Sequence, residues 1–327
     1  MERERLRYYD LISGLNLIRI IVMHIFQFSG NYYDTVFSFY MQVTFFFLPW
    51  FYFKAGYFFS NPKNGTKAYL IDKTKRLLLP FFIFTIIGFL IALPFELRDS
   101  TRPLWRIFLS PFYAMLRWGN GGNGNLPLWF LLSLFFTLTG FLFLNKFKLK
   151  WIIILFPVIG YVLYLYDVVL PLGLSNVFLA IFFLSAGNIY RHKIENKKFG
   201  PLLLGAAIGI YGFTQLFCFS SLDFRTNAIT SGNYFIYVIS ILAGLLLVYQ
   251  IGKRINYIKP INYIGENSIV YFVAHWPIIL LVKNIMDSFS LKTSGYGYAA
   301  ILSLVTFLLL PLCVKLLNGK LKFLLGR

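Results

Sequence analysis

Long apolar stretches, separated by short polar connections, follow one another along nearly the whole chain of 327 residues. A bilayer core of roughly 30 Å needs about 20 apolar residues in a helix, and a sliding window of about 19 residues predicts ten membrane spans. Their approximate bounds are 11–30, 36–60, 77–97, 126–145, 151–166, 175–190, 201–220, 232–251, 262–283 and 296–317. This pattern predicts an all-α, polytopic integral membrane protein with about ten transmembrane helices.

The composition is also typical of a membrane protein. Hydrophobic residues make up 58% of the chain, charged residues make up only 13%, and the mean hydropathy is +0.68. A water-soluble protein could not bury that much apolar surface, so a soluble class is excluded. The formal net charge of +19 would indicate nucleic-acid binding in a soluble domain, but in a membrane protein Lys and Arg first report orientation. No nucleic-acid partner is expected.

The distribution of positive charge predicts a cytoplasmic N-terminus. With that orientation, most of the 31 Lys and Arg residues fall on the inner side, as the positive-inside rule requires. The longest outer connection, residues 98–125, has Arg and Trp among apolar residues, which predicts a short helix lying at the membrane interface. Membrane lipids are therefore expected partners, and the basic inner face could also attract an anionic lipid or cofactor.

The first span contains polar residues that a lipid-facing helix would not carry. Within "LISGLNLIRIIVMHIFQFSG" lie Asn16, Arg19 and His24. An ionisable group at membrane depth is unfavourable unless it is paired or faces water, so each one is a candidate site residue. On a helical wheel Arg19 and His24 lie about 140° apart and Asn16 and His24 about 80°, so we expect Arg19 to point elsewhere. The alternative role for these groups is hydrogen bonding between helices.

A second histidine is expected at the same depth as the first. His24 lies about 13 residues past the cytoplasmic start of its span, which places it roughly 20 Å into the membrane. His275 lies equally far from Asn262 in "INYIGENSIVYFVAHWPIILL", within a helix that runs in the same direction. Equal depth permits the two imidazoles to meet in the outer half of the membrane.

Five segments carry a resemblance to a known family. In chain order they are "RYYDLISGLNLIRIIVMH", "PWFYFKAGYFF", "DKTKRLLLPFFIF", "GNLPLWFLLSLF" and "IGENSIVYFVAH". Together they resemble the signature segments of the membrane-bound acyltransferase-3 family, which includes O-antigen and other glycan O-acetylases. The resemblance implies a single membrane-embedded acyltransferase domain over residues 1–327, with Asp10 near the inner face. Ser13 stands where the family usually has a basic residue in the first helix.

The resemblance implies transfer of an acetyl or other short acyl group from cytosolic acyl-CoA to a hydroxyl of an extracytoplasmic or lipid-linked glycan. It also implies a bacterial cytoplasmic (inner) membrane location. The acceptor hydroxyl must lose its proton as the new bond forms, and histidine, with an ordinary pKa of about 6.5, suits that task. His24 is the predicted general base. His275, Asn267 or Ser268 would orient it or donate hydrogen bonds to the developing oxyanion.

Two further groups of residues are candidates for substrate binding. Lys73, Lys75 and Arg76, at the start of the third helix, are predicted to hold the phosphates of acetyl-CoA; the alternative is that they are ordinary positive-inside charges. Three tryptophans are predicted to stack on sugar rings of the acceptor, the alternative being interfacial anchoring. They are Trp105, Trp118 and Trp129.

A membrane transporter or exporter of a glycan or small organic acid is the alternative function. Ten helices with a buried His and Arg around a cavity would also fit a proton-coupled carrier. The sequence shows no paired interrupted helices in matching halves, which disfavours the carrier. It also has no CxxC, HExxH or carboxylate–histidine pattern, so no metal is expected.

Overall fold

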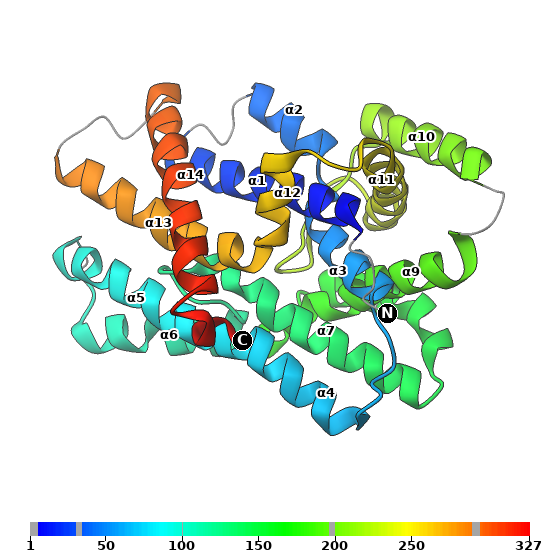
Figure 1. The fold of residues 1–327 in the computed structure, drawn as a ribbon, viewed down its shortest axis with the longest axis horizontal. Helices are drawn as coiled ribbons and strands as arrows, with labels where there is room; N and C mark the ends of the chain where they lie inside the picture. The colour runs from blue at the N-terminus through cyan, green and yellow to red at the C-terminus, as the bar shows by residue number, and fades with distance from the viewer. Residues whose placement is uncertain (1–5, 31–34, 100, 196–199, 290–294) are drawn as a thin grey trace.

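The computed structural model is almost entirely helical (Figure 1). It describes residues 6–30, 35–99, 101–195, 200–289 and 295–327. The elements are α1 (Arg7–Phe28), α2 (Thr35–Val43), α3 (Phe47–Tyr57), α4 (Gly65–Lys73), η1 (Thr74–Leu78), α5 (Leu79–Asp99), α6 (Leu104–Trp118), η2 (Leu126–Leu128), α7 (Trp129–Lys146), η3 (Lys150–Leu155), α8 (Phe156–Leu165), η4 (Pro171–Asn176), α9 (Val177–Ile189), η5 (Tyr190–Ile194), α10 (Gly200–Phe217), β1 (Ser221–Asp223), β2 (Ala228–Ser231), α11 (Tyr234–Ile255), α12 (Lys259–Glu266), α13 (Ser268–Ser288), α14 (Tyr296–Asn318) and η6 (Lys322–Leu325).

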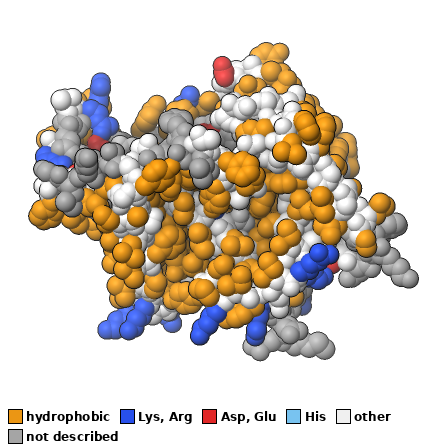
Figure 2. All heavy atoms as spheres, turned by 90° about the horizontal axis from the view of Figure 1, so that it is seen from above, with side chains coloured by type: hydrophobic (Ala, Val, Ile, Leu, Met, Phe, Trp, Pro, Cys, Tyr) orange, Lys and Arg blue, Asp and Glu red, His pale blue; other side chains and the backbone are white. Residues whose placement is uncertain are grey.

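The helices confirm the predicted all-α membrane fold. Seven helices in the described residues are long and apolar enough to cross a membrane, and Lys150–Leu165 and Pro201–Phe217 are shorter apolar helices. With α2 and α3, every predicted span coincides with helical residues. Figure 2 shows a broad band of hydrophobic side chains on one face, with several Lys and Arg side chains along its lower edge. Such an apolar surface is expected where lipid covers the protein.

The second predicted span, 36–60, is not one continuous helix. Helix α2 ends at Val43 and α3 begins at Phe47. Pro49 supplies the physical reason, because it has no N–H and its ring collides with the carbonyl one turn earlier, at Phe45. At the break, Thr44 Oγ1 accepts a hydrogen bond from Arg19 Nε, and the carbonyl oxygen of Met41, near the end of α2, accepts one from Arg19 Nη2 at 3.3 Å. The interruption therefore helps to place a charged residue of the first helix.

Two other predicted boundaries are also wrong. The basic segment before residue 77, expected as a connection, is helical, because Gly65–Arg98 forms one stretch of 34 residues. Lys67 and Lys75 are exposed on this stretch, so the helix extends beyond its apolar part. The ninth span is divided, since α12 ends at Glu266 and α13 begins at Ser268. His275 therefore lies only about two turns into its own helix.

Helix α1 lies at the centre of the fold and packs against α3, α11, α12, α13 and α14. Its crossing with α12, visible in Figure 1, depends on two glycines. A Cβ atom on Gly14 would lie 2.1 Å from Ile261 O, and one on Gly265 would lie 1.8 Å from Asp10 O. Only glycine permits this backbone contact, which resembles small-residue packing between membrane helices.

The predicted interfacial segment, 98–125, contains a helix as expected. Helix α6 packs against α5 and η4, and Figure 1 shows it beside α5. Ile107 faces the interior with 2% of its surface exposed. A continuous stripe of large apolar side chains on the opposite side is exposed: Leu104, Trp105, Phe108, Leu109, Phe112, Tyr113 and Leu116. This one-sided apolar exposure favours contact with lipid, and the position of α6 at the interface stays a prediction.

Candidate active site

The structure brings the two membrane-depth histidines into contact. The rings of His24 on α1 and His275 on α13 are stacked, with centroids 5.4 Å apart and planes inclined by 18°. Both side chains are buried, with exposed fractions of 7% for His24 and 0% for His275. Direct packing of α1 against α13 holds the two rings at one level. Equal depth, expected from residue counting, is thus realised even though the helix containing His275 starts later than predicted.

Hydrogen bonds define which nitrogen of each ring carries a proton. His275 Nδ1 lies 2.7 Å from Phe272 O and 3.1 Å from Tyr271 O. Carbonyl oxygens only accept, so Nδ1 donates and Nε2 of the neutral ring is an acceptor. Within the described residues, His275 Nε2 is buried without a hydrogen-bond partner. His275 can therefore orient its neighbour by stacking, but its neutral ring has no second N–H to offer an oxyanion.

Gln27 fixes His24 in a similar way. His24 Nδ1 lies 2.7 Å from Gln27 Oε1, one turn further along α1. With the amide oxygen accepting, Nδ1 carries the proton and Nε2 is the basic nitrogen. Sequence reasoning missed Gln27, although its position three residues after a buried histidine was a usable signal.

Trp276 is the second residue that sequence reasoning missed. Its ring meets His24 edge to face, with centroids 4.9 Å apart and an interplanar angle of 83°. Its Nε1 donates to Asn123 O at 3.0 Å, which ties α13 to the loop that precedes α7. Trp276 therefore limits the rotation of His24, and only its place beside His275 in the sequence pointed to this role.

A cavity of about 640 Å³ lies beside His24. Its walls come from α1, the break between α2 and α3, the start of α7, the β1–β2 hairpin, α11 and α13. The lining combines aromatic side chains, including Trp129, Tyr237 and Trp276, with polar ones. The polar and charged lining residues include Arg19, His24, Gln27, Asp223 and Arg225. This volume and mixture are typical of a site for a small organic ligand.

Arg19 lines the same cavity as His24, which corrects the expectation that it points elsewhere. The cavity extends around α1 at the α2–α3 break, so residues on two faces of α1 line it. Arg19 Nε donates to Thr44 Oγ1 at 3.1 Å, and its guanidinium lies 3.4 Å from the Phe47 ring centroid. These contacts stabilise a permanent charge that is only 3% exposed. A fixed positive charge therefore borders the cavity.

Closer to the predicted inner end of α1, a lysine approaches Ser13. Lys54 Nζ donates to Ser13 Oγ at 2.8 Å and lies 3.8 Å from Asp10 Oδ1. Lys54 of α3 therefore places a positive charge beside Ser13, the position at which the resembling family usually has a basic residue in its first helix. Asn16 is buried nearby in sequence, and its Nδ2 has no hydrogen-bond partner in the part of the chain described.

The structure does not bring Asn267 or Ser268 to the histidines. Asn267 donates from Nδ2 to Tyr263 O at 2.8 Å and accepts from Asn318 Nδ2 at 2.7 Å. Ser268 begins α13, so it lies about 10 Å along the helix axis from His275. The contacts of Asn267 favour a role in joining α12 to α14 instead.

Only one of the predicted substrate-binding residues lines the cavity. Trp129 lines the cavity, whereas Trp105 and Trp118 lie on α6 outside its lining, with Trp105 59% exposed. Lys73, Lys75 and Arg76 also lie outside that lining. Asp72 accepts from Arg76 Nε at 2.6 Å and from Lys73 Nζ at 3.2 Å, so part of this basic charge is neutralised.

Comparison with known proteins gives one positive result. A family model described as an acyltransferase domain matches residues 6–317, from the start of α1 to the end of α14. Neither the curated proteins nor the solved structures include a match to the chain. In the described residues no three His, Cys, Asp or Glu side chains gather as a metal site.

Proposed function

Since the chain belongs to the acyltransferase-3 family and is a membrane acyltransferase, we propose that it acylates a glycan from cytosolic acyl-CoA. The group is acetyl or another short acyl chain, and the acceptor is a hydroxyl of an extracytoplasmic or lipid-linked sugar. The observation that supports this best is His24, held by Gln27 and bordering a cavity of about 640 Å³. The enzyme would span the bacterial cytoplasmic membrane with its N-terminus inside.

His24 acts as the general base in this proposal. Its Nε2 takes the proton of the acceptor hydroxyl while the hydroxyl oxygen attacks the carbonyl carbon of the thioester. The tetrahedral intermediate then collapses, the carbon–sulfur bond breaks, and the imidazolium returns the proton to the sulfur of coenzyme A. Transfer is direct, without a covalent acyl–enzyme, and His275 keeps the base in position by ring stacking.

The cavity supplies groups that suit a sugar. Trp129 offers an aromatic face for a sugar ring, while Asp223 and Arg225 on the β1–β2 hairpin offer hydrogen bonds to hydroxyls. Arg19 adds a fixed positive charge that would stabilise the developing oxyanion. Trp105 and Trp118, given their place on α6, act as interfacial anchors instead.

The donor approaches from the opposite side. Lys73, Lys75 and Arg76 belong to a basic inner surface that attracts an anionic coenzyme from the cytosol. The pantetheine arm then extends between the helices toward His24. Asp10 lies on the inner half of α1 and forms an ion pair with Lys54 of α3, and this pair positions the helix beside the arm.

The direct test is acyl transfer by the purified protein. Radiolabelled acetyl-CoA and a glycan fraction from host membranes are incubated with the wild-type protein and with His24→Ala. We expect turnover to fall by about 10²- to 10⁴-fold, with binding of coenzyme A retained. Tyr166→Ala is the control for expression and purification of a variant. Tyr166 is 76% exposed, so this variant should keep full activity.

The same preparation separates the enzyme from the carrier. Reconstituted in sealed vesicles, an enzyme labels the glycan in a His24-dependent manner. Acceptor movement across the vesicle membrane without any labelled glycan would contradict the proposed function and favour the transporter alternative.

A further inference from the structure

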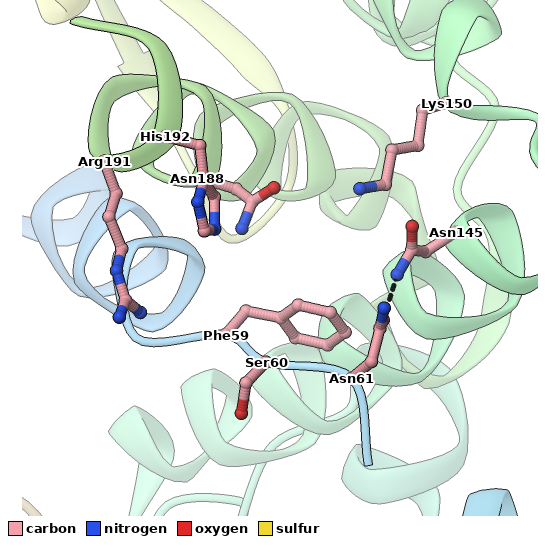
Figure 3. Close-up of a pocket in the computed structure, with 8 residues that line it drawn as sticks. All are labelled: Phe59, Ser60, Asn61, Asn145, Lys150, Asn188, Arg191 and His192. Atoms are coloured by element: carbon pink, nitrogen blue, oxygen red, sulfur yellow. Dashed lines mark hydrogen bonds between the residues drawn. The ribbon is translucent and has the colours of Figure 1, made fainter. Parts of the chain in front are cut away.

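Figure 3 shows a second cavity, which has a volume of about 270 Å³. It lies beyond the start of α1, where Phe58 meets Tyr9, whereas His24 lies near the other end of that helix. Three separate parts of the chain form it: the segment after α3, the end of α7 with the start of η3, and the end of α9 with η5. In the predicted orientation all three face the cytosol. None of its lining residues lines the active-site cavity.

Its lining is cationic and rich in amide groups. Lys150, Arg191 and His192 contribute basic side chains, and the eight residues that line it include no Asp or Glu. Asn61, Asn145 and Asn188 add side-chain amides. Figure 3 shows Lys150 extending into the space from the side opposite Asn188 and His192. Cations and amide N–H groups without a competing carboxylate favour an anion with several oxygens, such as a phosphate.

Close packing of α3 against α9 holds one wall of the pocket rigid. A Cβ atom on Gly56 would lie 1.8 Å from Leu184 O, and one on Gly187 would lie 2.0 Å from Phe53 O. The two helices therefore meet backbone to backbone just before their chains enter the pocket. A rigid wall lowers the conformational entropy lost on binding.

Hydrogen bonds fix the side chains that leave this wall. Arg191 Nη1 donates to Tyr57 O at 2.9 Å, and Asn188 Nδ2 donates to Gly56 O at 3.3 Å. On the other wall, Asn145 Nδ2 donates to Asn61 Oδ1. One guanidinium nitrogen is thereby anchored, and the planar group is oriented before any ligand arrives.

We propose that this pocket, named the Lys150–Arg191 pocket, binds the phosphate-bearing nucleotide end of the acyl donor. The inference rests on the proposed use of acyl-CoA. Lys73 and Arg76 share Asp72, whereas the Lys150–Arg191 pocket has no acidic lining residue, so the pocket is the stronger phosphate site. The surface at Lys73 and Arg76 then steers the donor, and the pocket holds it.

The distance to the active site suits this assignment. Phe58, next to the pocket residue Phe59, meets the ring of Tyr9 with centroids 4.8 Å apart. Tyr9 and His24 lie on one helix, separated by about 22 Å along its axis. An extended pantetheine arm covers a span of that order. A donor anchored in the pocket would therefore present its thioester near His24.

The test uses adenosine 3′,5′-bisphosphate, which keeps the 3′-phosphate and the first 5′-phosphate of coenzyme A but lacks its second 5′-phosphate and its pantetheine arm. Its binding to the purified full-length protein is measured by equilibrium dialysis. Lys150→Gln/Arg191→Gln should weaken binding by roughly tenfold or more, because charged hydrogen bonds to phosphate are lost. Lys150→Arg/Arg191→Lys keeps both charges and should restore most of the affinity, which excludes misfolding as the cause.

A matched control removes the same charge beside the pocket. Lys146 and Lys193 are exposed, belong to the same helix ends and do not line the pocket. Lys146→Gln/Lys193→Gln should leave affinity within about twofold of wild type, since diffuse surface charge contributes little. Equal weakening in both double variants, or unchanged binding in the pocket variant, would overturn the proposal.

An anionic lipid is the other possible source of a phosphate at this membrane face. Phosphatidylglycerol in nanodiscs is therefore tested as a competitor of the nucleotide. Lipid binding that depends on Lys150 and Arg191, with no nucleotide binding, overturns the donor assignment. Nucleotide binding that depends on both residues supports the site. If this binding is found without any acyl transfer, the proposed function is refuted and the nucleotide site is still supported.

Discussion

The identity of the proton-accepting atom depends on a single residue contact. Gln27 accepts from His24 Nδ1, so the basic nitrogen is Nε2, the one available to an acceptor hydroxyl. Trp276 restricts the ring from its edge, and His275 restricts it from its face. A general base held on three sides keeps its alignment with the reacting hydroxyl, and even small misalignment lowers the rate.

Changing Gln27 tests this positioning role. Gln27→Leu removes the acceptor for Nδ1–H, so we expect turnover to fall by about 10- to 100-fold while the KM for the donor changes little. Gln27→Glu keeps an acceptor oxygen and should restore most of the activity. Steady-state kinetics across a range of pH provide the readout; equal losses in both variants, with no change in the pH profile, would indicate a merely structural contact.

At the scale of elements, the crossing of α1 and α12 positions the inner half of the first helix. Gly265→Ala places a methyl group against the backbone carbonyl of Asp10. We expect a loss of unfolding free energy of roughly 1–3 kcal/mol, as for other overpacked interiors. Thermal unfolding of the detergent-solubilised protein would measure it.

Gly209→Ala on α10 is the matched control for that substitution. A Cβ atom there meets nothing within 4 Å, and alanine favours a helix over glycine. The control should melt at the wild-type temperature or slightly above it. If Gly265→Ala and Gly209→Ala have the same melting temperature, the close α1–α12 contact does not stabilise the fold.

Most elements could be predicted from apolar runs, because a lipid-spanning helix must be long and hydrophobic along its whole length. The features that shape the cavity could not. Pro49 was a visible signal for the α2–α3 break, but whether a proline bends or divides a membrane helix depends on its neighbours. The β1–β2 hairpin is too short and too polar to give a periodic pattern, although its residues line the cavity.

The same limit applies to the site. His24 and His275 could be paired from their depth, since residue counting along helices gives position across the membrane. The contact of Gln27 with His24 could have been predicted, because residues three apart on a helix lie on the same face. The contacts of Trp276 with His24 and of Lys54 with Ser13 join different helices, and only the packing of those helices reveals them.

The whole molecule must have one orientation for the two cavities to serve donor and acceptor. Lys148 lies beside the Lys150–Arg191 pocket, and Tyr166 lies in the connection at the other end of α8. After Cys218 and Cys313 are changed to serine, an impermeant maleimide should label Tyr166→Cys in sealed cells. Lys148→Cys should react only after permeabilisation. The reverse pattern would contradict a cytoplasmic N-terminus.

The central claim is that His24 performs the proton transfer that joins acyl donor to acceptor. The most direct measurement is the single-turnover rate of acetyl transfer at saturating acetyl-CoA, for the wild type and for His24→Ala. The account predicts a rate lower by about 10²-fold or more in the variant, with the donor still bound. A variant that transfers the acetyl group at the wild-type rate would contradict it.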